Sequence, residues 1–128
     1  MEDGIWKMEY KRFENIEVWQ FAKELAIEIY KITYKMDFRK DYALIDQMRR
    51  SALSISSNIA EGYERNSKRE LAQFLNIAKG SVGELRSQLI IASELGRISR
   101  LDYEKFAAIC ESISKQLKGF IKFLEKNR

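Results

Sequence analysis

The hydrophobic positions of this 128-residue chain recur at steps of three and four residues over four long segments. In the first segment this spacing runs from Val18 to Met36, and in the last it runs from Tyr103 to Leu124. Such spacing places one apolar stripe on each helix and is typical of helix bundles. The pattern predicts an all-α protein, whose helices are expected at about 15–36, 42–65, 67–95 and 99–126.

Polar residues at the ends of these segments predict where the helices begin and end. Ser67 stands three residues before Glu70, which is the spacing of a capping box. Gly96 is expected to end the third helix, and Ser99 is expected to cap the fourth. Asn15 is the expected N-cap of the first helix. Because the connections are short, the helices are predicted to form an antiparallel up-down-up-down bundle.

One domain is expected, because a chain of this length can bury one core well and two cores poorly. The domain is predicted to span residues 15–128, after an N-terminal extension of residues 1–14. The extension contains large apolar side chains, among them Trp6 and Tyr10, that a solvated tail does not need. Two interpretations stay open: a partly ordered tail, or an arm that packs on a neighbouring subunit.

The composition is that of a folded, helix-rich, soluble protein, since 45% of the residues are hydrophobic, 33% are charged and proline is absent. No apolar run is long enough to span a bilayer, and no signal peptide is recognisable, so a cytoplasmic protein without a membrane partner is expected. The single cysteine, Cys110, allows no internal disulfide and is expected to be buried. Histidine, the commonest general base and metal ligand, is absent. We therefore expect no enzymatic activity, no cofactor and no metal site.

The second helix contains an unusual number of small and hydroxylated side chains between residues 51 and 62. A glycine inside a helix costs about 1 kcal/mol relative to alanine, so several glycines need a compensating reason. One interpretation is a close approach of the second and third helices, with Ser51 opposite Gly80. The other is a shallow helix surface that receives a ligand or another subunit. The residues assigned to close packing are Ser51, Gly62, Gly80 and Gly83.

Polar side chains form a further stripe on the same pair of helices. If Ser54 lies near Ile77, this stripe faces polar residues of the third helix and an Arg50–Glu84 ion pair can form. Buried polar groups are stable only when they are hydrogen-bonded, so we expect a connected structural network that fixes the helix register. Its predicted members are Gln47, Arg50, Ser54, Asn58, Glu61, Ser81 and Glu84.

Positive charge is concentrated at the end of the last helix, although the net charge of the chain is only +4. Lysines recur there at three- and four-residue steps, on the side opposite to Leu117 and Phe120, so they are expected to face solvent. They form either an ordinary solvated face or, when repeated around an oligomer axis, a surface that attracts a phosphate backbone. No aromatic residues interleave with these lysines, so any nucleic-acid binding should be sequence-tolerant. The candidate nucleic-acid-binding residues are Lys115, Lys118, Lys122, Lys126 and Arg128.

Two motifs in this sequence resemble those of a known family. The first is QMRRSALSISSNIAEG at residues 47–62, and the second is AKGSVGE at residues 78–84. Together with the segment from Phe13 to Thr33, they resemble the four-helix-bundle proteins encoded in the intervening sequences of bacterial 23S rRNA genes. Ser51 departs from this pattern, because the family usually has alanine there.

The resemblance implies a protomer that assembles into a homopentameric barrel with a central channel. A related branch of the family serves as the accessory variability protein of diversity-generating retroelements, where a basic pentamer is associated with a reverse transcriptase and with nucleic acid. The implied partners are therefore other copies of the chain, RNA or DNA, and a reverse transcriptase. The alternative is a structural oligomer that binds another protein and no nucleic acid.

Overall fold

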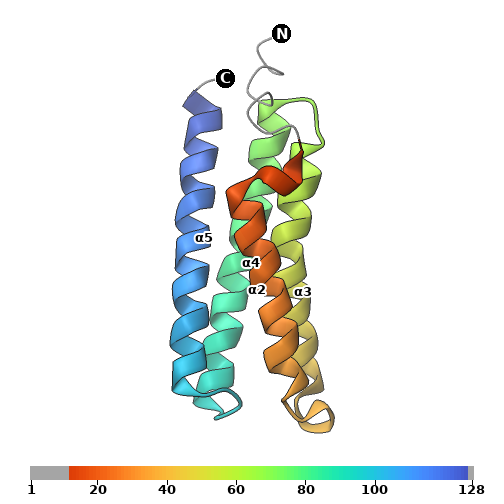
Figure 1. The fold of residues 1–128 in the computed structure, drawn as a ribbon, viewed down its shortest axis with the longest axis vertical. Coiled ribbons are helices and arrows are strands. Elements are labelled where there is room, and N and C mark those ends of the chain that lie inside the picture. Colours follow the sequence, from red (N-terminus) through yellow and green to blue (C-terminus); the bar gives the residue numbers. More distant parts are fainter. Residues whose placement is uncertain (1–11, 127–128) are drawn as a thin grey trace.

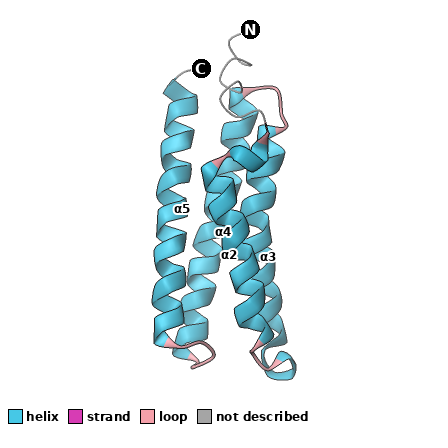
Figure 2. Cartoon of the chain, in the orientation of Figure 1, coloured by secondary structure: helices cyan, strands magenta, loops and turns pink. Residues whose placement is uncertain are grey.

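The computed structural model describes residues 12–126, which form a bundle of four long helices (Figure 1). The elements are the 3₁₀ turn η2 (Phe13–Asn15) and the helices α2 (Glu17–Tyr34), α3 (Phe38–Tyr63), α4 (Lys68–Glu94) and α5 (Arg100–Lys126). Neighbouring helices run in opposite directions, and no strand occurs within the described residues (Figure 2). The prediction of an all-α four-helix bundle is confirmed.

The predicted caps are present at the ends of α4 and α5. Ser67 Oγ accepts a hydrogen bond from Glu70 N at 3.0 Å and caps α4. Gly96 follows α4 with a φ of 73°, the left-handed conformation that glycine adopts without strain. Ser99 Oγ accepts from Asp102 N at 3.0 Å at the start of α5. The two serine side chains and the backbone conformation of Gly96 therefore fix both ends of the α4–α5 connection and the start of α4.

The N-terminal end of the bundle differs from the prediction. Asn15, the predicted cap of the first helix, belongs to η2, and α2 begins at Glu17 without a side-chain cap. Phe13 packs edge-on against Trp19, with ring centroids 5.1 Å apart. The packed chain therefore includes residues before the predicted domain boundary at residue 15. The rest of the N-terminal extension, residues 1–11, lies outside the described residues.

Helix α3 begins at Phe38, before its predicted start at residue 42. Asp37 Oδ1 accepts a hydrogen bond from Arg39 N at 3.0 Å and caps the helix. Asp41 is not helical, with φ −116° and ψ 25°, and its buried carboxylate lies 2.8 Å from Arg97 Nε. This kink interrupts the first turn of α3, which is why the apolar periodicity becomes regular only after it.

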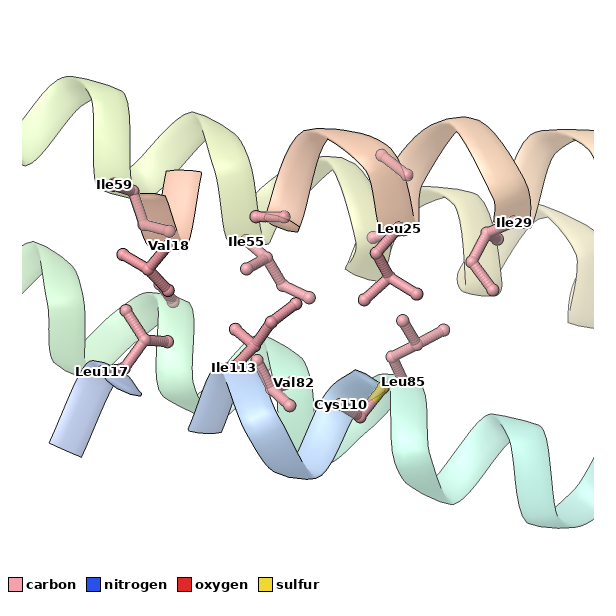
Figure 3. Close-up of a cluster of buried hydrophobic side chains, with 14 of the residues drawn as sticks. Val18, Leu25, Ile29, Ile55, Ile59, Val82, Leu85, Cys110, Ile113 and Leu117 are labelled. Atoms are coloured by element: carbon pink, nitrogen blue, oxygen red, sulfur yellow. The ribbon is translucent and has the colours of Figure 1, made fainter. Parts of the chain in front are cut away.

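The core extends along the bundle axis and consists mainly of aliphatic side chains from all four helices (Figure 3). Leu25 of α2, Ile55 of α3, Leu85 of α4 and Ile113 of α5 are among its fully buried members. Cys110 is buried among them, as predicted. Its burial raises the pKa of the thiol to about 11, so the nucleophilic thiolate is scarce at neutral pH.

Candidate nucleic-acid interface

The predicted basic face is a solvent-exposed stripe on the second half of α5. Its described members are all exposed; they are Lys115, Lys118, Lys122 and Lys126. Lys115 Nζ lies 3.6 Å from Glu111 Oε1, one turn earlier, in an exposed pair. The other three lysines form no ion pair within residues 12–126. Arg128, the last predicted member, lies outside the described residues. The stripe therefore presents positive charge that the surrounding side chains neutralise only in part.

Basic side chains of α4 extend this surface, because α4 and α5 pack side by side. Arg86 is exposed and lies close enough to Cys110 of α5 for its positive charge to oppose the rise in the pKa of the thiol that burial causes. Arg69 lines a groove of about 230 Å³ between the start of α4 and the end of α5, together with Glu125. Arg69 was a further candidate from the sequence, together with Arg65, Lys68, Arg97 and Arg100. Arg86 was not predicted, because the helical period of α5 contains no information about its neighbour.

Three residues of the predicted polar network are hydrogen-bonded to one another. Ser81 Oγ of α4 donates to Ser54 Oγ of α3 at 2.8 Å. Asn58 Nδ2 donates to the same oxygen at 2.9 Å and to the Ser54 carbonyl at 2.8 Å. Ser81 is buried, and so is Ser51, which was assigned to close packing nearby. This small network joins the two helices by a polar contact beside the apolar core.

The predicted Arg50–Glu84 ion pair is wrong. Arg50 Nε lies 2.9 Å from Asp46 Oδ2, one turn earlier on the same helix. Glu61 of α3 forms an ion pair with Arg65, just beyond the end of the same helix, at 3.0 Å from its guanidinium. Glu84 is exposed and forms no ion pair within the described residues, and Gln47, a further predicted member, is also exposed. These four residues therefore take no part in the network that joins α3 to α4.

The contacts between α3 and α4 lie about one turn farther from their connection than predicted. Ser54 contacts Ser81, whereas the predicted neighbour, Ile77, is exposed. The reason is that side chains on a helix lean toward its N terminus. In an antiparallel pair, the side chains of α3 lean away from the connecting turn and those of α4 lean toward it. A residue of α3 therefore contacts a residue of α4 that is farther from the turn than equal counting along both helices predicts.

The sequence matches a family model described as 23S rRNA-intervening sequence protein over residues 14–119. The chain belongs to this family. The matched region covers α2, α3, α4 and most of α5, and it includes both motifs from which the resemblance was inferred. The family description names no reaction.

This intervening-sequence protein is also similar to a solved structure, described as a protein with unknown function from the S23 ribosomal protein family of Bacteroides thetaiotaomicron VPI-5482. The two share 29% sequence identity and a TM-score of 0.75, over 82% of this chain and 98% of that chain. Among curated proteins, none matches the sequence significantly.

The glycines of the family motifs have two different surroundings. A Cβ added to Gly62 would lie 2.7 Å from Phe74 Cβ and 2.9 Å from Leu71 Cδ1, so α3 and α4 approach closely there. A Cβ added to Gly80 or Gly83 would meet no described atom within 4 Å. The assignment of these two glycines to close packing is therefore wrong, because both lie on the exposed outer face of α4.

The described residues contain neither a metal-binding cluster nor a membrane-spanning helix. Within residues 12–126, no three His, Cys, Asp or Glu side chains lie together in a way that could hold a metal ion. No helix in this range combines the length and the apolarity that a membrane crossing requires. The basic surface of α5 and α4 is the candidate site because of its exposed, largely unneutralised positive charge.

Proposed function

We propose that this chain is a cytoplasmic, non-catalytic protein that assembles into a homopentamer and binds nucleic acid through the basic stripe of α5. The observation that carries the proposal is the run of exposed lysines, of which Lys118, Lys122 and Lys126 form no ion pair within residues 12–126. A side chain without a protein partner can neutralise a phosphate without first breaking an ion pair. Several copies around one axis would multiply these contacts and the resulting affinity.

Binding of this kind depends on salt and tolerates different sequences. A lysine ammonium contacts phosphate oxygens as a point charge and does not recognise base edges. Each neutralised phosphate releases condensed counterions, so the affinity falls as the salt concentration rises. Arg69 and Arg86 of α4 lie on the same side of the bundle and would lengthen the path of a bound backbone.

RNA is the first ligand to test. The family description refers to 23S rRNA, and the structural neighbour is described as belonging to a ribosomal protein family. A role as an accessory protein of a reverse transcriptase is a finer proposal, which rests on the resemblance to the retroelement branch. This accessory role would use the same basic surface. A reverse transcriptase works on nucleic acid, and a basic oligomer could hold that nucleic acid in place.

Charge reversal tests the proposal. The variant Lys118→Glu/Lys122→Glu/Lys126→Glu changes exposed lysines of the stripe, and Arg12→Glu/Lys23→Glu/Arg50→Glu is a control of equal net charge that leaves α4 and α5 unchanged. We expect the stripe variant to lose RNA affinity and the control to retain it. The slope of log K against log salt should become shallower by about one for each lysine that contacts a phosphate.

The same experiment distinguishes the alternative, a structural oligomer that binds another protein. That alternative predicts equal RNA affinity for the wild type and both variants, and its support would be a protein recovered with the purified chain. Light scattering measures the solution mass of each variant, and a monomer mass for the wild type would contradict the pentamer. An ultraviolet absorbance ratio of the purified protein would reveal co-purified nucleic acid.

A further inference from the structure

A second surface, at the other end of the bundle, combines exposed aromatic rings with exposed basic side chains. It lies at the turn between α2 and α3, whereas the α5 stripe leads to the opposite end, where the C terminus lies (Figure 1). The exposed fractions are 85% for Tyr34, 56% for Phe38 and 57% for Tyr42. None of these rings contributes to the buried core, so packing within the bundle gives no reason for three aromatic residues here.

The rings are arranged with their faces accessible. Phe38 and Tyr42 are one turn apart on α3 and pack edge to face, with centroids 5.1 Å apart and an angle of 84° between their planes. This contact fixes both orientations and covers only one face of one ring. Tyr34, with Tyr30, also lines a groove of about 660 Å³ between α2 and α5. A planar ligand of the size of a nucleobase therefore has both a ring surface and an adjoining groove.

Basic side chains surround these rings and outnumber the nearby acids, most of which are already engaged; Asp102, which lines the groove beside Tyr34, forms no ion pair within residues 12–126. Asp37 caps α3, and the buried Asp41 forms an ion pair with Arg97. Glu28 lies 3.6 Å from the ammonium of Lys31 and 3.6 Å from that of Lys105. Three exposed basic side chains form no ion pair within residues 12–126; these are Lys35, Arg39 and Lys40. The surface that faces solvent is therefore positively charged.

We propose that this surface binds single-stranded nucleic acid, with unpaired bases stacked on Tyr34, Phe38 and Tyr42 and with phosphates bound by Lys35, Arg39 and Lys40. Stacking platforms among cations are how proteins bind single strands without sequence preference. A duplex hides its base faces within its own stack, so the rings discriminate in favour of unpaired strands. The proposal shares its ligand class with the proposed function, but it concerns a different surface and adds a preference that the α5 lysines cannot supply.

The test compares one RNA strand, which has no self-complementarity, with the same strand annealed to its complement. Fluorescence anisotropy measures the affinity of the full chain for both. For Tyr34→Ala/Phe38→Ala/Tyr42→Ala we expect the single-strand affinity to fall tenfold or more, while the duplex affinity and the salt slope stay unchanged. The matched control, Ile90→Ala/Ile91→Ala/Leu101→Ala, removes exposed apolar side chains elsewhere and should bind both ligands as the wild type does.

Two further variants keep the test decisive. Tyr34→Leu retains an apolar side chain at the most exposed position and should still weaken single-strand binding, even if the triple variant folds poorly. The stripe variant, Lys118→Glu/Lys122→Glu/Lys126→Glu, should weaken single-strand and duplex binding together. Loss of binding by the α5 stripe is therefore distinguishable from loss of binding by the aromatic rings. The proposal is overturned if the ring variants bind single strands normally or lose both ligands equally. A lower solution mass with unchanged RNA affinity also overturns it and assigns the rings to a contact between proteins.

Discussion

Gly62 of α3 and Gly80 of α4 belong to the two family motifs and lie inside neighbouring helices, but their surroundings are opposite. At Gly62 the two helices approach so closely that a single added carbon would lie 2.7 Å from Phe74 Cβ. At Gly80, and at Gly83 one turn later, the same carbon would meet no described atom within 4 Å. A small residue in a shared motif therefore has no single physical meaning, and only the packing around it distinguishes a contact from an open surface.

The difference follows from where each residue lies around its helix. Gly62 faces Phe74 and Leu71 near the turn that joins α3 to α4, where the backbones of the two helices lie close together. Gly80 and Gly83 point away from the core, on a face that also carries the exposed Ile77 and Glu84. In the first case glycine permits a contact, and in the second it lowers helix stability without any packing gain against residues 12–126.

The largest expected effect of this comparison is at Gly62. Gly62→Ala should lower the free energy of unfolding by about 2 kcal/mol, because Phe74 Cβ cannot move away without its helix and overpacking outweighs the gain in helix propensity. Urea denaturation followed by circular dichroism measures this change. Gly119→Ala is a suitable control, since a Cβ there would meet no described atom within 4 Å. A stability equal to or above that of the wild type would contradict the close approach.

The hydrogen bond between α3 and α4 should have the next largest effect. Ser81 Oγ and Ser54 Oγ are 2.8 Å apart, and Asn58 donates to the same Ser54 oxygen. A double-mutant cycle with Ser54→Ala and Ser81→Ala should give a coupling energy of about 1 kcal/mol. A coupling indistinguishable from zero would show that the two serines do not fix the register of the helices.

The regular parts of this fold were predictable because their signals are local. Ser67, Gly96 and Ser99 each act within one turn of their own position, and the apolar period of each helix depends only on that helix. The start of α3 was missed because the kink at Asp41 is accompanied by an ion pair with Arg97, which lies beyond α4 in the sequence. A local pattern contains no signal for such a contact.

The candidate site, too, was predictable only where its signal is local to one helix. The lysine stripe of α5 follows from the period of one helix, and its exposure agrees with that prediction. Its extension to Arg86 depends on which face of α4 lies beside α5, and the partner of Arg50 depends on the register between α3 and α4. These are properties of the assembled helices, and a single sequence without an alignment does not specify them.

The outer face of α4 should respond to alanine in the opposite direction to Gly62. Gly80→Ala and Gly83→Ala should each raise the free energy of unfolding by about 0.5–1 kcal/mol, because alanine has the higher helix propensity and meets no obstacle. Light scattering of the same variants extends the comparison to the proposed oligomer. If either variant is less stable than the wild type or has a smaller solution mass, this face is a contact and not an open surface.

The smallest expected effect concerns Arg50, whose partner was predicted on the wrong helix. A double-mutant cycle between Arg50 and Glu84 should give no coupling, since Arg50 Nε instead lies 2.9 Å from Asp46 Oδ2. The cycle between Arg50 and Asp46 should give about 0.3–0.5 kcal/mol, the range for an exposed pair one turn apart with the acid on the N-terminal side. This coupling should decrease in high salt, because both side chains are accessible to counterions. A larger coupling between Arg50 and Glu84 would restore the register predicted from the sequence, and with it a direct contact between Gly80 and α3.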